Sequence, residues 1–458
     1  MTDLHDLTAL QQAAAIRSGE ITSLALTEHY LRRTESLAAT VGAFISRTPA
    51  LALAAARSAD AAVAARGSQL GPLHGVVVPI KDLNAMVGVP MRGGSAVFDL
   101  MPQVDDDTVA LLRQAGTVCT GTTNAPELGL PCYTENRIAP PARTPWDLTR
   151  MAGGSSGGAA AAVATGLAPL ALGSDGGGSI RIPASCTGLV GIKPSRGLVS
   201  NGPLGDAVGE LVVQGPLART VADAAAMLDV LTERSTFLAA AQRQPDRLVV
   251  GRYRDPVIAD TTLDPEVVDA YEAASALLAD LGHEVVDIER PFAPDVVPQF
   301  EAVWSVLALL TPVPPDREAD LMPLTRWLRA RGEQVSGLQL AQAVSRMRAL
   351  SRAAIAGSAH VDVVLSPTLA KLPAPVGALR NDQDPAADFE AQKQFTPFTS
   401  PYNISGQPAI SLPLHWTADD IPVGVQIIGR PFGECTMLSL AAQLEKARPW
   451  IQRRHELW

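Results

Sequence analysis

Three stretches of the 458-residue chain contain residue types that could act together on a carbonyl group. Lys81 follows the apolar run "HGVVVPI" (74–80), "AGGSSGGAA" spans 152–160, and "GSDGGGSIR" spans 173–181. A serine that cleaves an amide needs a base for its proton, a route for that proton to the leaving nitrogen, and donors for the oxyanion. The three stretches supply a lysine, several serine hydroxyls and a run of glycines, which match these needs.

A lysine can act as the base only where burial lowers its pKa from about 10.4 toward neutrality, because desolvation disfavours the ammonium form. Lys81 is the lysine of this chain with an apolar approach and a loop after it. The three glycines before Ser179 leave their N–H groups unshielded and adopt positive φ freely. Such a loop suits a nest of donors around a developing negative charge. The residues therefore favour serine chemistry without a histidine.

Two familiar motifs fit the second stretch less well. "GGSSGG" lacks the lysine of a phosphate-binding loop. Residues 154–158 match GxSxG with Ser156 as the nominal nucleophile, but a nucleophile elbow follows a strand, and "PWDLTRMA" (145–152) is a poor strand. The histidines form no HxH or HExxH pattern, so a metal site of sequence-local ligands is not predicted; they are residues 5, 29, 74, 283, 360, 415 and 455. A Ser–His–acid hydrolase would have to recruit one of these histidines, none of which lies in a distinctive motif, and is therefore disfavoured.

Composition narrows the class of protein. The chain is 47% hydrophobic and 18% charged, so it can bury a sizeable core. Its net charge of −10 argues against nucleic acid or an anionic membrane surface as the main partner. The four cysteines share no CxxC spacing, which is typical of free thiols in a reducing compartment. With no signal-peptide pattern at "MTDLHDLTAL" and no apolar run of about 20 residues, we expect a cytoplasmic protein.

Helical and strand-like segments alternate along the chain. Helices are predicted over 21–37, 47–65, 107–115, 158–165, 219–231, 265–281 and 434–447. Strands are predicted over 74–80, 117–121, 247–253, 283–289, 361–367, 408–414 and 424–429, with a further apolar run leading into 173–181. This alternation favours an α/β protein with a largely buried sheet. The segment 236–360 has the fewest glycine-rich landmarks, and we expect it to be a variable insertion.

Several blocks together resemble the amidase signature family. They are "VVPIKDL" (77–83), "GTTNAPELGL" (121–130), the serine- and glycine-rich block from "PARTPWDL" (141–148) to "GIKPSRG" (191–197), and "PVGVQIIGRPFGE" (422–434). The resemblance covers most of 70–232 and 395–450. It implies one domain over residues 1–458, with a mixed, mostly buried central β-sheet flanked by helices.

The resemblance also implies a catalytic triad of serine, cis-serine and lysine. Lys81 matches the lysine of the family's "KD" pair, Ser155 the bridging serine after a cis peptide bond, and Ser179 the nucleophile. Lys81 would take a proton from Ser155, and Ser155 would take one from Ser179. The backbone N–H groups expected to bind the oxyanion are those of Gly176, Gly177, Gly178 and Ser179. No metal or other cofactor is implied.

Further residues receive supporting roles in the same way. Those expected to support the loop or the triad are Ser156, Ser174, Asp175 and Arg181. Those expected to line the acyl side of the pocket are Gly129, Leu130, Pro131 and Tyr133.

The implied activity is hydrolysis of a carbonyl C–N bond in a small, fairly apolar aryl or alkyl amide, with carbamates (urethanes) and esters as related substrates. A monomer or homodimer is expected. One alternative is the glutaminase-type chain of a tRNA-dependent amidotransferase, which usually has threonine and glutamine where this chain has Gly176 and Ile182. That departure favours similarity to free-standing aryl acylamidases and nylon-oligomer hydrolases. A non-catalytic scaffold of the same fold is a second alternative.

Overall fold

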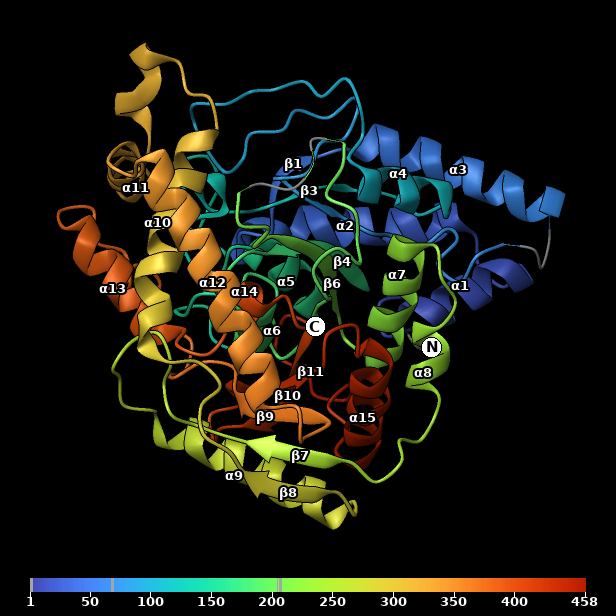
Figure 1. The fold of residues 1–458 in the computed structure, drawn as a ribbon. Coiled ribbons are helices and arrows are strands. Elements are labelled where there is room, and N and C mark those ends of the chain that lie inside the picture. Colours follow the sequence, from blue (N-terminus) through green and yellow to red (C-terminus); the bar gives the residue numbers. More distant parts are fainter. Residues whose placement is uncertain (1–2, 67–69, 204, 206–207) are drawn as a thin grey trace.

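The computed structural model describes residues 3–66, 70–203, 205 and 208–458, and within them a sheet of eight strands runs through the molecule (Figure 1). In order across the sheet, the strands are β4 (Leu170–Asp175), β6 (Val213–Ala218), β5 (Val190–Lys193), β10 (Ala409–Trp416), β11 (Pro422–Gly429), β9 (Val363–Pro367), β7 (Val249–Arg252) and β8 (Glu284–Asp287). Neighbours are antiparallel from β4 to β9 and parallel from β9 to β8. The predicted mixed sheet flanked by helices is confirmed.

A second, smaller sheet contains β1 (Phe44–Arg47), β3 (Gly121–Thr123) and β2 (Ile80–Lys81), in that order. A backbone hydrogen bond of 3.2 Å from the Leu172 N–H to the Pro79 carbonyl joins this sheet to β4. Lys81 therefore lies where the two sheets meet.

The predicted strands over 74–80 and 117–121 are wrong in extent. Their pairing is limited to one parallel bridge, between Val77 and Val118, before β2 and β3 begin. Pro79 has no N–H to donate and interrupts the ladder between that bridge and Ile80.

Helices surround both sheets (Figure 1). The α-helices are α1 (Ala9–Ser18), α2 (Ser23–Val41), α3 (Pro49–Arg66), α4 (Asp107–Gln114), α5 (Gly157–Ala164), α6 (Arg181–Thr187), α7 (Val221–Thr232), α8 (Phe237–Ala241), α9 (Pro265–Asp280), α10 (Val297–Leu310), α11 (Pro323–Glu333), α12 (Gly337–Gly357), α13 (Pro385–Phe395), α14 (Pro401–Ser405) and α15 (Glu434–Ala447). Short 3-10 helices are η2 (Glu127–Gly129), η3 (Pro294–Val296) and η4 (Pro315–Asp320). In Figure 1, α10 to α13 gather on one side of the molecule, away from α1 and α8.

Threonine side chains cap the starts of two helices. The Thr22 side chain accepts a hydrogen bond from the Ala25 N–H at the start of α2, and Thr220 caps α7 in the same way through Asp223. The strand, helix and strand predicted over 247–253, 265–281 and 283–289 are confirmed as β7, α9 and β8, and the two strands are parallel. Gly282 follows α9 with a φ of +92°, as expected for a residue just past a helix end.

Helix α5 is buried along its whole length, because its sequence "GGAAAAVA" has no polar side chain to place in water. A Cβ on Gly157 would lie 2.4 Å from Thr134 Oγ1, and one on Gly158 would lie 2.3 Å from the Asn124 backbone nitrogen. Glycine at both positions lets the first turn of α5 pack directly against the segment after β3. This contact fixes the two serines immediately before the helix.

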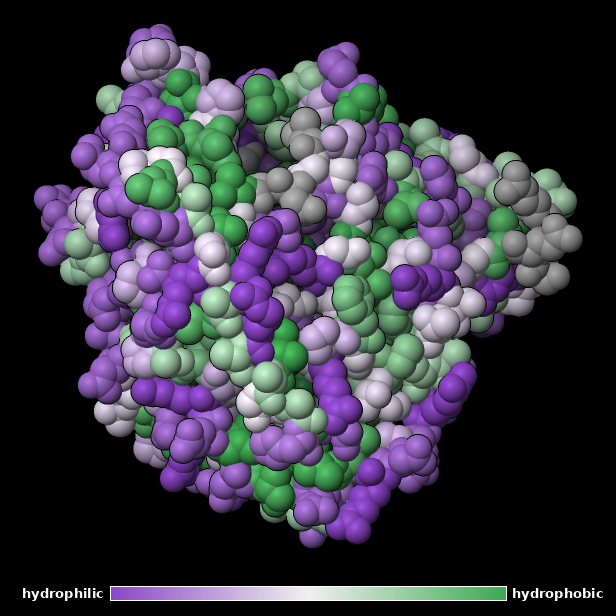
Figure 2. Space-filling model, in the orientation of Figure 1, coloured by the Kyte–Doolittle hydropathy of each residue, from purple (hydrophilic) through white to green (hydrophobic). Residues whose placement is uncertain are grey.

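On the face drawn in Figure 2, hydrophilic residues are interspersed with hydrophobic ones. Among the residues that the structure describes, no helix combines the length and the apolar character needed to cross a membrane.

Candidate active site

The side chain of Lys81 is fully buried and ends among three serine hydroxyls. Its Nζ donates to Ser155 Oγ at 2.8 Å, to Ser156 Oγ at 2.9 Å and to Ser174 Oγ at 2.9 Å. An ammonium group has three N–H donors, so each hydroxyl can receive one. The structure thus brings together the predicted base, the predicted bridging serine and two of the predicted supporting residues.

Burial lowers the pKa of Lys81 to about 7, although the negative charge of Asp175 opposes the shift. A lysine with this pKa is neutral in a large fraction of molecules at pH 7 and can then accept a proton. The site has the electrostatics that a lysine base requires.

Two chain segments place the serines around Lys81. Ser174 lies on β4, whereas Ser155 and Ser156 lie in the turn before α5, and the peptide bond between Gly154 and Ser155 is cis. Ser156 Oγ donates to the Ser174 carbonyl at 3.1 Å and accepts from the Ser174 N–H at 3.2 Å, which locks the turn to β4. The Ser156 N–H donates to the Ser179 carbonyl at 3.1 Å. The backbone of the predicted nucleophile is therefore held beside the same turn.

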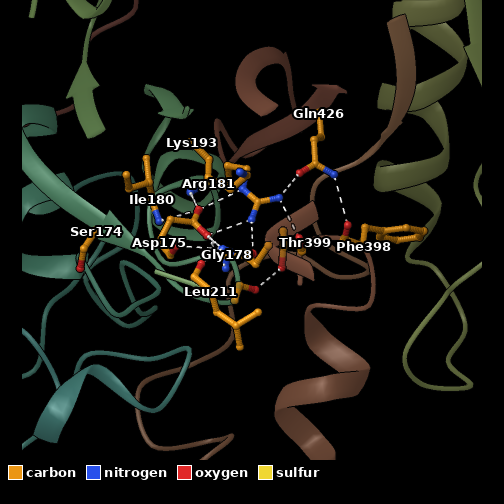
Figure 3. Close-up of polar contacts among 12 residues, drawn as sticks. Ser174, Asp175, Gly178, Ile180, Arg181, Lys193, Leu211, Phe398, Thr399 and Gln426 are labelled. Atoms are coloured by element: carbon orange, nitrogen blue, oxygen red, sulfur yellow. Dashed lines mark hydrogen bonds and ion pairs between the residues drawn. The ribbon is translucent and has the colours of Figure 1, made fainter. Parts of the chain in front are cut away.

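The loop between β4 and α6 is closed by Asp175 at one end and Arg181 at the other (Figure 3). The Asp175 carboxylate accepts from the N–H groups of Gly178 at 2.8 Å and Ile180 at 3.2 Å. Arg181 donates to it from Nε and Nη2, each at 2.9 Å. Burial alone would raise the pKa of Asp175, but the Arg181 guanidinium holds it well below its usual range. The carboxylate is therefore ionised and fixes the loop, the supporting role expected for both residues.

This network changes the set of donors available for an oxyanion. Asp175 takes the N–H of Gly178, so the prediction that this group faces the substrate is wrong for the loop as folded. Within the described part of the chain, no acceptor is found for the N–H groups of Gly176, Gly177 and Ser179. Thr399 Oγ1 donates to the Gly177 carbonyl at 2.7 Å, so side chains hold both the carbonyl and the N–H of the Gly177–Gly178 peptide group.

A pocket with about 570 Å³ of empty space, including its open mouth, has Ser179 and Gly177 in its wall. Its other lining residues are Leu130, Pro131, Cys132, Ile182, Ile258, Val297, Phe300, Glu301, Trp304, Phe389, Gln392, Lys393, Thr396 and Ser400. Most of the wall is apolar. Ser179, the nucleophile predicted from the sequence, is part of this wall.

Two of the four residues predicted for the pocket do not line it. Gly129 packs against Ser155 instead, since an added Cβ at Gly129 would be 3.3 Å from Ser155 Oγ. Tyr133 is buried with its hydroxyl donating to Asp388 at 2.7 Å. Leu130 and Pro131 do line the pocket.

Most of the wall was missed by reasoning from the sequence. It comes from one face of α10 and from α13 with the residue after it, far from the serine-rich blocks, together with Ile258 and Ser400. The lining residues of α10 recur at helical spacing (297, 300, 301 and 304), and so do those of α13 and its C-cap (389, 392, 393 and 396). Such spacing marks any amphipathic helix and does not single out a substrate pocket.

Metal ions in proteins are held by sets of ligand side chains. In residues 3–66, 70–203, 205 and 208–458, no group of three or more His, Cys, Asp or Glu side chains is arranged to hold a metal ion.

Comparison with known proteins gives a consistent picture. The family model described as Amidase matches residues 25–438. A Mycobacterium tuberculosis protein named "Putative amidase AmiB2" is 39% identical over 99% of this chain and 98% of its own length. The 6-aminohexanoate-cyclic-dimer hydrolase of Paenarthrobacter ureafaciens is 34% identical over 98% of this chain and 96% of its own. One chain of the glutamyl-tRNA(Gln) amidotransferase of Chloroflexus aurantiacus is 32% identical over 100% of both sequences.

Structural comparison agrees with the sequence relatives. A solved structure of 6-aminohexanoate cyclic dimer hydrolase matches with a TM-score of 0.91 and 31% identity over 100% of both chains. The family model and the relatives each span most of this chain, as does the structural match. The chain belongs to the amidase signature family, and it is an amidase, a hydrolase that acts on C–N bonds.

Proposed function

We propose that the protein hydrolyses a small, fairly apolar amide through an acyl-enzyme on Ser179, with carbamates (urethanes) and activated esters as alternative substrates. The observation that carries the proposal is the 2.8 Å hydrogen bond between the buried Lys81 Nζ and Ser155 Oγ. It supplies a base whose pKa is near neutrality and a hydroxyl that can pass a proton on.

In the proposed mechanism, neutral Lys81 takes a proton from Ser155 while Ser155 takes one from Ser179. The Ser179 oxygen attacks the substrate carbonyl, and the N–H groups of Gly176, Gly177 and Ser179 stabilise the oxyanion. The relay then returns a proton to the leaving nitrogen as the C–N bond breaks. Water, deprotonated through the same relay, attacks the acyl-enzyme and releases the acid and free Ser179.

The apolar side chains around Ser179 support a substrate with an aryl or alkyl body. Phe300 and Trp304 stack with ring centroids 5.2 Å apart, and both line the pocket, as does Ile182. Burying aromatic or alkyl surface against such walls is favourable by about 25 cal/mol per Å². Anilides and alkyl amides are therefore preferred to highly polar amides in the proposal.

The test is acyl transfer to hydroxylamine by the isolated chain on a panel of anilides and carbamates, with wild type and Ser179→Ala compared. We expect hydroxamate from the wild type and none from the variant, because the variant lacks the hydroxyl that the proposal assigns to acyl-enzyme formation. Equal yields from both proteins would refute the assignment of Ser179. Circular dichroism spectra of the two proteins should superpose, so that a lost signal is not misread as misfolding.

The same assay separates a free-standing amidase from the glutaminase component of an amidotransferase. The free-standing enzyme turns over anilides alone, whereas the glutaminase component would be inactive on them without its partner proteins. Turnover of glutamine but of no anilide by the isolated chain would favour the second candidate, which is supported by the 32% identity to the Chloroflexus aurantiacus amidotransferase chain.

A further inference from the structure

Two charged side chains interrupt the mostly apolar wall of the pocket that contains Ser179. Glu301 projects from α10 and Lys393 from α13, and both line the pocket. Lys393 Nζ lies 2.8 Å from Glu301 Oε1, with side chains only 18% and 16% exposed. Charged groups are seldom held this far from water without a partner or a function. The pair is absent from the proton relay described above.

Both groups have hydrogen-bonding capacity beyond the contacts they make. Lys393 also pairs with Glu390 Oε2 at 2.7 Å, so two of its three N–H donors are used. Glu301 also pairs with Arg331 Nη2 at 2.9 Å, so two of its roughly four lone-pair positions are used. One donor and one or more acceptor positions are thus left for a bound molecule.

The charges around this pair already balance. Glu301 and Glu390 face Lys393 and Arg331, two negative against two positive groups. A ligand with a net charge would add an uncompensated charge to a largely apolar pocket, which is costly. A neutral group with both an N–H donor and a carbonyl acceptor matches what the pair offers. A carboxamide or urea group has this chemistry.

The pair lies close to the reacting centre. On α10, Trp304 packs against Gly176 and Phe300 against Gly177, where added Cβ atoms would lie 3.2 Å and 3.5 Å from their rings. Glu301 is next to Phe300 in the sequence. It lies less than one helical turn before Trp304, which is about 5 Å along the helix axis. A group bound at Glu301 is therefore a short distance from the glycine loop, with aromatic surface between.

We propose that Glu301 and Lys393 are specificity-determining residues that select amides carrying a second, neutral carboxamide-type group beyond a short apolar spacer. Lys393 donates to the carbonyl of that second group, and Glu301 accepts from its N–H. The spacer lies against Phe300 and Trp304 while Ser179 attacks the first carbonyl. This inference rests on the proposed function for the identity of the attacking residue, but its binding preference can be measured without catalysis.

The test uses four anilides with the same short alkyl spacer, which end in methyl, carboxamide, carboxylate or ammonium. Binding of each is measured by calorimetry to Ser179→Ala, which holds substrate without consuming it. We expect the carboxamide to bind about tenfold more tightly than the methyl analogue, as one or two hydrogen bonds to charged groups provide. Turnover of the same series by wild type should follow the same order.

The discriminating variant replaces both charges by apolar groups of similar volume, as Glu301→Met/Lys393→Met. Changing both together leaves no unpaired charge in the pocket wall. We expect the order to invert, so that the methyl analogue binds better than the carboxamide. A pair that only clamps α10 to α13 would weaken both ligands alike and leave their ratio unchanged. The matched control is Glu390→Gln, which removes the other acid on Lys393 outside the pocket and should keep the ratio.

Other outcomes overturn the inference. Tightest binding of the carboxylate or of the ammonium compound would make the pair a site for a charged group. An unchanged ratio of carboxamide to methyl binding in the double variant, or no binding of any compound, would show that the pair does not select the substrate. A carboxamide preference without Ser179-dependent turnover in wild type would instead refute the proposed function and leave the specificity assignment standing.

Discussion

Asp175 and Arg181 form a completely buried ion pair that closes the glycine loop, with Nε–Oδ2 and Nη2–Oδ1 distances of 2.9 Å each. The pair spans the chain from the end of β4 to the start of α6. Asn403 Nδ2 adds a hydrogen bond of 2.8 Å to the same carboxylate. The loop that carries Ser179 is thus shaped by side chains that do not line the pocket.

Asp175→Asn should destabilise the protein by about 3–5 kcal/mol, because it leaves the Arg181 charge buried without its counter-ion. Urea denaturation measures the loss. Asp382→Asn is the matched control, since Asp382 pairs with Arg380 at the surface and should cost about 1 kcal/mol or less. Equal losses in the two variants would mean that the buried pair does not hold the loop.

Lys81→Met should fold and lose at least about a hundredfold in turnover, since the base is gone. The effect on stability follows from the lowered pKa of Lys81, about 7 in the folded protein against about 10.4 when unfolded. Charging the buried lysine is unfavourable, so its cost is complete below pH 7 and disappears as the pH rises toward 10. The variant should therefore gain stability relative to wild type, most below pH 7, in urea titrations at several pH values. Wild-type turnover in the variant would place the base elsewhere.

The rate of acylation should rise with pH through about 7, because only neutral Lys81 accepts a proton. Ser174→Ala removes one hydroxyl that accepts from the ammonium form, so it should lower the pKa of Lys81 further. The rising limb of the kcat/KM profile then moves to lower pH. A limb that moves to higher pH, or stays in place, contradicts this account of the lysine.

Thr399→Val should reduce kcat about tenfold, with KM changed less, because the Gly177–Gly178 peptide group, whose N–H donates to Asp175, loses the second hydrogen bond that holds the loop before Ser179 in place. The cost in stability should be about 1 kcal/mol. Thr399→Ser keeps the hydroxyl and should restore most of the activity. If serine and valine behave alike, Thr399 is only a packing residue.

The catalytic roles of the lysine and the serines could be predicted because these residues occur in short contiguous blocks whose residue types indicate a particular chemistry. Lys81 follows an apolar run, and Ser155 and Ser179 follow glycines, so each local pattern limits what the side chain can do. The pocket could not be predicted, because Phe300 and Lys393 meet only through the packing of α10 and α13. Nothing in either helix sequence indicates its partner.

The strands and the oxyanion donors were predicted less well for local reasons. A run of valines indicates a strand, but Pro79 removes the hydrogen bond that would continue it into Ile80. The N–H of Gly178 is taken by the side chain of Asp175, three residues before it. Aspartate often hydrogen-bonds to backbone N–H groups a few residues on, and that tendency was the available signal.

The position of Lys81 on the small sheet makes activity a reporter of how the two sheets are assembled. The serines it contacts belong to β4 and to the turn before α5, and the Leu172–Pro79 hydrogen bond is a direct backbone link between the sheets. A slight separation at that boundary would draw the lysine away from its hydroxyls while both sheets kept their own hydrogen bonds. On gentle heating, inactivation should therefore precede the loss of secondary structure.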